Sequence, residues 1–216
     1  MTQSEQRARR VVRRWPLISG LAAVLLVVAG GVLLAARTSS LSVDDEWMEE
    51  IVEHRNPVWE VPSLVMNFLG GGLFAAVIVP LGIIGALCLV RRFWAALYFA
   101  IASLVSVGLV QLLKAVFGRA RPLDMLLTLD SGSFPSGHVA NAATMAVALG
   151  LIFARTWVWV VGAVYTVLMM LSRTYLGVHW LSDTVGGVLL GAAVSVIVWA
   201  PFAYRLQQEA VHRRHP

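Results

Sequence analysis

Residues 93–122 read FWAALYFAIASLVSVGLVQLLKAVFGRARP, an apolar run that ends in a group of cations. Crossing the roughly 30 Å of hydrocarbon in a bilayer takes about 17 to 25 residues of α-helix, and this run is long enough. Lys114 stands near its end, and Arg121 follows seven residues later. Because charged groups are costly in hydrocarbon, this junction predicts a membrane span with functional groups at one end.

The whole chain has the composition of a helical membrane protein. Hydrophobic residues make up 58% of its 216 residues and charged residues only 13%, against about 25% charged residues in ordinary soluble domains. Its mean hydropathy is +0.76. We therefore expect an all-α integral membrane protein that forms a single membrane domain, 1–216.

Six apolar runs predict six transmembrane helices. They are expected at about 17–36, 63–90, 93–116, 138–154, 157–171 and 180–204. The first run lacks a clean small-x-small cleavage site, which favours a retained span over a signal peptide. The single cysteine, Cys88, lies in an apolar run and excludes an internal disulfide.

Basic residues predict the orientation in the membrane, since lysine and arginine near span ends favour the cytoplasm. The residues that precede the first span and set the orientation are Arg7, Arg9, Arg10, Arg13 and Arg14. Alternation from a cytoplasmic basic tail at 1–16 then places further arginines inside, namely Arg91, Arg92, Arg155 and, in a tail at 205–216, Arg205, Arg213 and Arg214. Both termini are therefore expected in the cytoplasm.

The net charge of +5 follows from these flanking arginines and does not indicate a nucleic-acid partner. The basic residues are nearly all arginine, which is typical of a GC-rich bacterial genome. We expect a multi-pass protein of the bacterial inner (cytoplasmic) membrane, with the lipid bilayer as its environment. The sequence makes no prediction of oligomeric state.

The first outer segment, 37–62, is acidic and amphipathic. Its apolar residues would share one face of a helix, and they are Val43, Trp47, Met48, Ile51 and Val52. Its acidic residues fall largely on the other face, and they are Asp44, Asp45, Glu46, Glu49, Glu50 and Glu53. This pattern predicts a short helix on the outer leaflet, either a gate for lipid entry or a solvated connector.

The same topology brings the cations and histidines between 114 and 183 to the outer face. Lys114, Arg121 and Arg173 are candidates for binding the oxygens of a phosphate group, which suits an ammonium and planar guanidinium forks. Phe134 to His138 predict a turn that enters a helix. There the Ser136 hydroxyl, the close backbone approach allowed at Gly137 and free amide groups could bind an anion.

His179 and Asp183 lie four residues apart and would share a helix face. The carboxylate can accept a proton from one ring nitrogen and leave the other free to attack phosphorus. His138, His179 and Asp183 could in principle hold zinc. Three neighbouring cations disfavour a metal, so none is expected.

Three motifs carry a family resemblance: Lys114 with Arg121-Pro122, Pro135 to His138, and Ser172-Arg173 with His179 and Asp183. They resemble the signatures of type 2 phosphatidic acid phosphatases, the membrane lipid phosphatase branch of a superfamily that includes vanadium haloperoxidases. The resemblance implies a helical bundle, a phosphohistidine on His179, general acid catalysis by His138, and no metal or organic cofactor.

The sequence therefore predicts a metal-independent phosphatase that acts on a lipid at the outer face of the membrane. A polyprenyl pyrophosphate, phosphatidylglycerophosphate and phosphatidic acid are the candidate substrates. Arg119 could contact a second phosphate or a headgroup, or be a loop charge. The alternatives are a lipid phosphotransferase that uses the same pocket, a haloperoxidase, and a transporter or scramblase; no inverted repeat or broken-helix pair dominates the sequence.

Overall fold

The computed structural model describes residues 3–129 and 131–212, and no strand occurs in this part of the chain. Its helical elements are α1 (Gln3–Ala35), α2 (Ser42–Glu53), α3 (Pro57–Gly70), the π-helical segment η1 (Phe74–Ile78), α4 (Val79–Leu89), α5 (Phe93–Phe117), α6 (Gly137–Phe153), α7 (Thr156–Tyr175) and α8 (Leu181–His212). The all-α prediction is confirmed.

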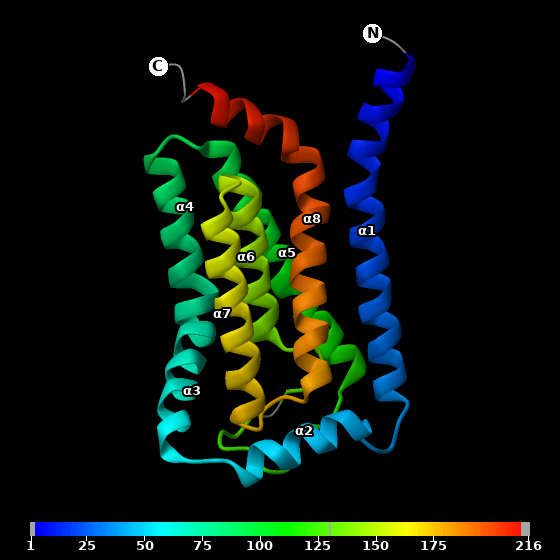
Figure 1. Ribbon diagram of the computed structural model, residues 1–216, viewed down its shortest axis with the longest axis vertical. Coiled ribbons are helices and arrows are strands. Elements are labelled where there is room, and N and C mark those ends of the chain that lie inside the picture. Colours follow the sequence, from blue (N-terminus) through cyan, green and yellow to red (C-terminus); the bar gives the residue numbers. More distant parts are fainter. Residues whose placement is uncertain (1–2, 130, 213–216) are drawn as a thin grey trace.

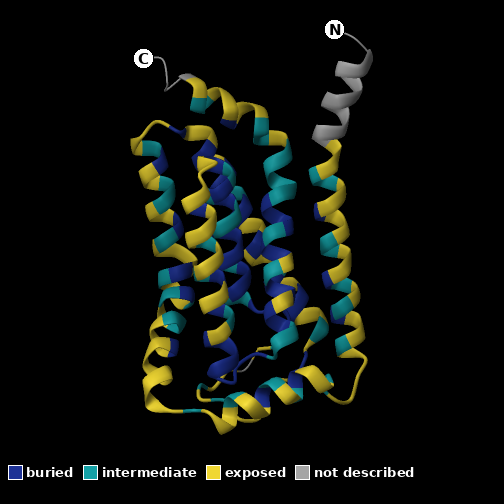
Figure 2. Cartoon of the chain, viewed as in Figure 1, coloured by how far each residue is buried: buried dark blue, intermediate teal, exposed yellow. Residues whose placement is uncertain are grey.

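The long helices run side by side, and α2 lies across one end of the bundle (Figure 1). The beginning of α1 and the end of α8 lie at the opposite end. Helix α6 packs against α5, α7 and α8, while α1 packs mainly on α8. Buried residues concentrate on the facing sides of α5, α6 and α8, and the outward faces are largely exposed apolar surface (Figure 2).

Small residues allow α6 and α8 to approach closely, as is common between membrane helices. A Cβ atom at Gly191 would lie 2.3 Å from the carbonyl oxygen of Ala140, and one at Gly187 would lie 2.7 Å from that of Ser136. Since α6 and α8 both begin near the α2 end, their contact holds the residues at these two helix starts together.

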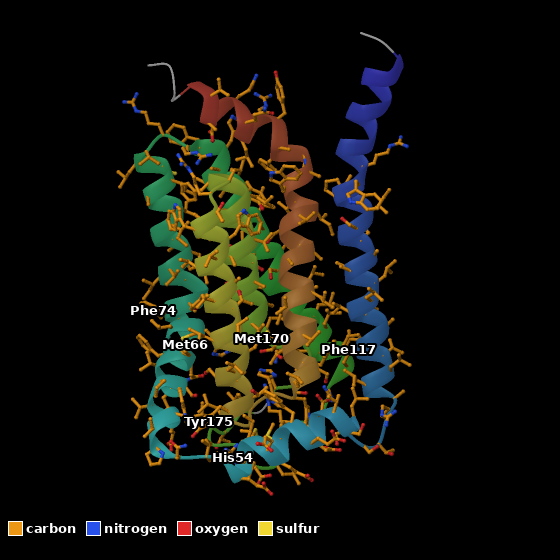
Figure 3. The ribbon with its side chains drawn as sticks, viewed as in Figure 1. His54, Met66, Phe74, Phe117, Met170 and Tyr175 are labelled. Atoms are coloured by element: carbon orange, nitrogen blue, oxygen red, sulfur yellow. The ribbon has the colours of Figure 1, made fainter. Side chains whose placement is uncertain are left out.

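Other side chains fix the outer helices to this centre. A Cβ atom at Gly31 of α1 would lie 2.2 Å from the ring of Phe117, which is seen between α1 and α8 in Figure 3. Met66 of α3 and Met170 of α7 pack beside the buried Met169. At the α2 end, the hydroxyl of Tyr175 donates to the carbonyl of Asn56 at 2.7 Å, which ties α7 to the α2–α3 connection.

Among the described residues, four helices are long and apolar enough to cross a membrane, namely α1 from Arg14 onward, α5, α7 and α8. A fifth span results if α3 and the following η1–α4 segment count as one. Helix α6 is apolar but has 17 residues. A helical membrane bundle is thus supported, and six spans stay a prediction.

The span predicted at 63–90 is bent in the structure and begins at an earlier residue. Helix α3 begins earlier, at Pro57, and ends at Gly70, and the chain bends by 45° before it resumes at Phe74. The break coincides with Gly70-Gly71-Gly72, where Gly72 has φ +59°, a conformation that glycine adopts without strain. The chain does contain a broken-helix pair, contrary to the expectation from sequence.

The described parts of the two predicted cytoplasmic tails are helical. Helix α1 already begins at Gln3, and α8 continues to His212. The Glu209 carboxylate accepts hydrogen bonds from the backbone amides of Trp94 at 2.6 Å and Ala95 at 3.2 Å, so the end of α8 caps the start of α5. Arg213 and Arg214, and the side chains of Arg7, Arg9, Arg10 and Arg13, lie outside the described residues.

Helix α2 forms within the predicted amphipathic segment, but its faces differ from those expected. Met48 is buried, whereas Val43 is 51% exposed. Asp44, expected on the solvated face, is completely buried. The reason is that its carboxylate accepts hydrogen bonds from Arg119 and Ser182, which the sequence pattern of α2 alone could not reveal.

Candidate functional site

A cavity of about 250 Å³ lies at the end of the bundle where α2 crosses it. It is bordered by the α3–η1 break, the last turns of α5 and α7, the start of α6 and the loops between them. The predicted site residues that line it are Lys114, Arg121, Gly137, His138, Arg173 and His179. Residues scattered over 66 positions of sequence, from 114 to 179, are therefore brought to one pocket.

Lys114 enters the cavity from the last turn of α5. It is 9% exposed, and its Nζ donates to the carbonyl of Gly132 at 2.6 Å. Gly118 ends α5 with φ +53°, so the chain turns away directly after this lysine. Because this ammonium group borders the cavity, it can pair with an anion that binds there.

Arg121 connects the α5–α6 loop with the α7–α8 loop at the cavity. Its Nε donates to the carbonyl of Ser131 at 2.9 Å, and its Nη1 donates to the carbonyl of Val178. Carbonyl oxygens fix the guanidinium without neutralising it. The group therefore keeps a full positive charge at the edge of the pocket.

Arg173, in the last turn of α7, is completely buried. Its Nη1 donates to the side-chain oxygen of Asn67 on α3, and its Nε has no hydrogen-bond partner among the described residues. Among the described residues no carboxylate pairs with Arg173, and a buried cation of this kind is costly, so it indicates a place where an anion binds.

The start of α6 carries Ser136 at the N-cap position and His138 in the first turn. Ser136 is fully buried behind the cavity; its amide donates to the carbonyl of Asp183 at 3.0 Å, while its hydroxyl has no partner in the described part of the chain. The His138 ring contacts the α3–η1 break, where a Cβ atom at Gly71 would lie 2.2 Å from its Nε2.

His179 lies in the loop between α7 and α8, and its Nδ1 is 3.5 Å from Oδ2 of Asp183. The same Oδ2 accepts the backbone amide of Trp180 at 2.9 Å. Burial lowers the pKa of His179 to about 4 against the opposing effect of Asp183. The imidazole is therefore neutral at pH 7, and its second ring nitrogen has an unshared electron pair and can act as a nucleophile.

Arg119 does not line the cavity. Its guanidinium is 2.8 Å from Asp44 Oδ2 and 2.6 Å from Asp183 Oδ1, and it lies over the ring of Trp180. Because two carboxylates already occupy its donors, this geometry disfavours the phosphate or headgroup contact predicted for Arg119. The same contacts also disfavour the second interpretation of Arg119, an exposed loop charge without a partner.

Sequence reasoning missed several polar groups of the site. Gln111 and Asn141 line the cavity, and Asn67 orients Arg173 from α3. Gln111 precedes Lys114 by three residues and so shares its helix face, a signal that was available. Asn67 and Asp44 carry no such signal, because their partners lie between 75 and 138 residues away in the chain.

In the part of the chain that the structure describes, the pocket holds no assembled set of metal ligands. Within residues 3–129 and 131–212, the group of three acidic or histidine side chains with ligand atoms within 4.8 Å of one another is Glu50, Glu53 and His54. These residues lie on the exposed surface of α2. His138, His179 and Asp183 do not converge in that way.

The bundle and its pocket define a structural class, an α-helical membrane protein with a cationic, histidine-containing cavity at one end. A family model identifies the particular family: the chain matches the PAP2 superfamily over residues 93–207, and it belongs to that superfamily. The matched region runs from α5 to α8 and includes every predicted site residue.

Two relatives with named activities are similar to this chain. The chain is 29% identical to phosphatidylglycerophosphatase B of Bacillus subtilis over 73% of this chain and 82% of that protein. It is 33% identical to undecaprenyl-diphosphatase of Sulfolobus acidocaldarius over 45% of this chain, and the match spans half the length of that relative. The predicted family is confirmed, and the activities named for these relatives support the predicted class, a lipid phosphatase.

Solved structures agree with this relationship. A transmembrane PAP2-type phosphatidylglycerolphosphate phosphatase from Bacillus subtilis superposes with a TM-score of 0.67 at 27% identity, over 90% of this chain and 96% of that one. Aquifex aeolicus LpxE superposes with a TM-score of 0.65 at 27% identity, over 74% of this chain and 97% of that one. The fold described above, from α1 to α8, is therefore that of membrane PAP2 phosphatases.

Proposed function

We propose that this protein is an integral membrane phosphatase that removes phosphate from a lipid through a covalent intermediate on His179. The observation that carries the proposal is the convergence of three cations and two histidines on one cavity of about 250 Å³. Three positive charges match a phosphoryl group, whose transition state spreads negative charge over its equatorial oxygens.

In the first step, Lys114, Arg121 and Arg173 hold the oxygens of the lipid phosphate. Nε2 of His179 attacks phosphorus, a P–N bond forms, and the P–O bond to the lipid breaks. His138 donates a proton to the leaving oxygen, so the lipid departs as an alcohol or, from a pyrophosphate, as a monophosphate. Asp183 stabilises the positive charge that develops on the His179 ring.

In the second step, His138 accepts a proton from water, and the hydroxide attacks the phosphohistidine. The P–N bond breaks, inorganic phosphate leaves, and His179 returns to its neutral form. All groups in this cycle belong to the chain, so we propose that no metal or organic cofactor takes part.

The relatives define the substrates to be tested. Phosphatidylglycerophosphate and undecaprenyl pyrophosphate are the lipids in the names of the two relatives above, and phosphatidic acid is the third candidate. The ion pairs of Arg119 with Asp44 and Asp183 weaken the case for a pyrophosphate, because they engage the side chain that was expected to contact a second phosphate.

We further propose six spans with both termini in the cytoplasm of a bacterial cell and the pocket on the periplasmic or exterior face. The location of the pocket at the end opposite the start of α1 and the end of α8 supports this sidedness. Counting α6 and the bent α3–α4 unit as one span each brings the number to six.

Phosphate release by the detergent-solubilised protein from the three lipids tests the proposal. We expect turnover of at least one of them and an acid-labile phosphoenzyme during the reaction. Transfer of the phosphoryl group to an added lipid alcohol in place of water would indicate the phosphotransferase alternative. Absence of turnover, together with lipid movement in reconstituted vesicles, would favour a transporter or scramblase.

A further inference from the structure

A buried ion cluster lies directly behind the pocket. Arg119, 8% exposed, is placed between two carboxylates that are completely buried, Asp44 of α2 and Asp183 of α8. Its Nη2 lies 2.8 Å from Asp44 Oδ2, and its Nη1 lies 2.6 Å from Asp183 Oδ1. Arg119, Asp44 and Asp183 do not line the cavity, yet the Asp183 carboxylate faces His179, which does.

The cluster is fixed by further contacts. Asp44 Oδ1 accepts the backbone amide of Ser182 at 2.9 Å, and Asp44 Oδ2 accepts the Ser182 hydroxyl at 2.6 Å. The guanidinium carbon of Arg119 lies 5.7 Å from the centre of the Trp180 ring, whose Nε1 donates to the carbonyl of Ala120 at 3.0 Å. Helix α2, the α5–α6 loop and the start of α8 are thereby joined around one guanidinium.

This arrangement determines how Asp183 faces the histidine. One carboxylate oxygen, Oδ1, is occupied by Arg119, which leaves the other, Oδ2, for Trp180 and His179. A guanidinium that bonds two carboxylates through separate nitrogens restricts the rotation of both. Orientation of a catalytic pair in this way affects the rate strongly, because small displacements of reacting groups are costly.

We propose that Arg119 and Asp44 are positioning residues of the reaction: Arg119 orients the Asp183 carboxylate toward His179, and Asp44 of α2 holds Arg119 in place. The inference rests on the proposed phosphatase mechanism, in which Asp183 acts on His179. It assigns α2 a role in catalysis beyond that of an outer connector.

Kinetics of four variants test the proposal. Arg119→Gln is expected to lower kcat by about 100-fold and Asp44→Asn by about tenfold, with KM within about threefold of wild type, because neither residue reaches the phosphate. Arg119→Lys keeps the charge and is expected to recover at least about tenfold over Arg119→Gln. Glu49→Gln, the same kind of charge loss at an exposed position of α2, serves as the control and should match wild type.

The pH dependence separates positioning from mere destabilisation. His179 is faced by Asp183, by Lys114 of α5, by Arg173 of α7 and by His138 of α6. Loss of the Arg119 charge leaves Asp183 unbalanced, so the protonated imidazole is stabilised and the pKa of His179 rises. The acidic limb of kcat/KM should move upward by about one pH unit in Arg119→Gln and stay in place in Arg119→Lys.

If kcat falls only in proportion to the amount of folded protein, without a shift of the acidic limb, the role is purely structural and the proposal is overturned. Unchanged kinetics in Arg119→Gln would overturn it as well. A histidine NMR titration of wild type and Arg119→Gln, assigned with His179→Ala, measures the same shift without turnover. A wild type that hydrolyses none of the lipids would contradict the proposed phosphatase. The titration would still decide whether Arg119 acts on the His179–Asp183 pair.

Discussion

At the level of single residues, the proposed chemistry depends on a neutral imidazole in a cationic pocket. Replacing His179 by alanine removes the nucleophile, and we expect turnover to fall by at least about a thousandfold, equivalent to roughly 4 kcal/mol of transition-state stabilisation. His54→Ala, at an exposed histidine after α2, is the matched control. Phosphate release from both purified variants is the measurement, and wild-type turnover by well-folded His179→Ala would disprove the assignment.

The pocket cations predict a second property of the site. Vanadate takes a trigonal bipyramidal form that resembles pentacoordinate phosphorus, so it should bind among Lys114, Arg121 and Arg173 and inhibit competitively. Chelators should leave turnover unchanged, since no metal is required by the mechanism. The test is turnover with vanadate and, separately, after EDTA treatment; loss of activity in EDTA that zinc restores would bring back the metal hypothesis.

The pocket residues were predictable where the local sequence pattern itself indicated a function. Lys114, Arg121 and Arg173 are recognisable as functional because a cation in apolar surroundings needs a reason to be there. Asn67, Asp44 and the true partners of Arg119 were not predictable, because each contact joins residues far apart in the chain. Helix packing, which no local pattern encodes, brings them together.

At the level of elements, the break between α3 and η1 belongs to the site. Gly70 and Gly71 lie against His138, and the missing side chains leave room for its ring. The sequence shows one apolar run at 63–90, and hydropathy alone cannot tell a straight span from a bent one. The close approach to His138 supplies the physical reason for glycine here.

Gly71→Ala tests this contact. The new Cβ would lie 2.2 Å from His138 Nε2, so the imidazole must shift, while the backbone can remain because φ of Gly71 is −134°. We expect the fold to persist and kcat to fall by at least about tenfold, because the general acid is displaced. Gly82→Ala, at a helical glycine of α4 with open space around it, is the control. Equal activity of the two variants would show that the position of the ring is not critical.

At the level of the whole molecule, the all-α membrane bundle was predictable from composition, whereas the helix ends were not. Positions 205–212 read as a polar tail by sequence, yet Glu209 caps the start of α5 and Arg205 lies over Trp94 at 4.8 Å. These contacts tie α8 to α5 at the end of the bundle remote from the pocket. Charged residues at a span end can thus serve tertiary contacts as well as topology.

Sidedness is the prediction that concerns the whole molecule. The arginine distribution places Arg91, Arg92 and Arg155 in the cytoplasm, and the pocket then faces the periplasm or exterior and receives its lipid from the outer leaflet. With Cys88 replaced, a cysteine at Leu123, which is 97% exposed in the loop beside the pocket, should react with a membrane-impermeant maleimide in intact cells. A cysteine at Thr156, exposed at the opposite end of the bundle, should react only after the cells are permeabilised. The reverse labelling pattern would place the pocket in the cytoplasm and refute an outer-leaflet substrate, because the impermeant reagent reaches only groups outside the bilayer barrier.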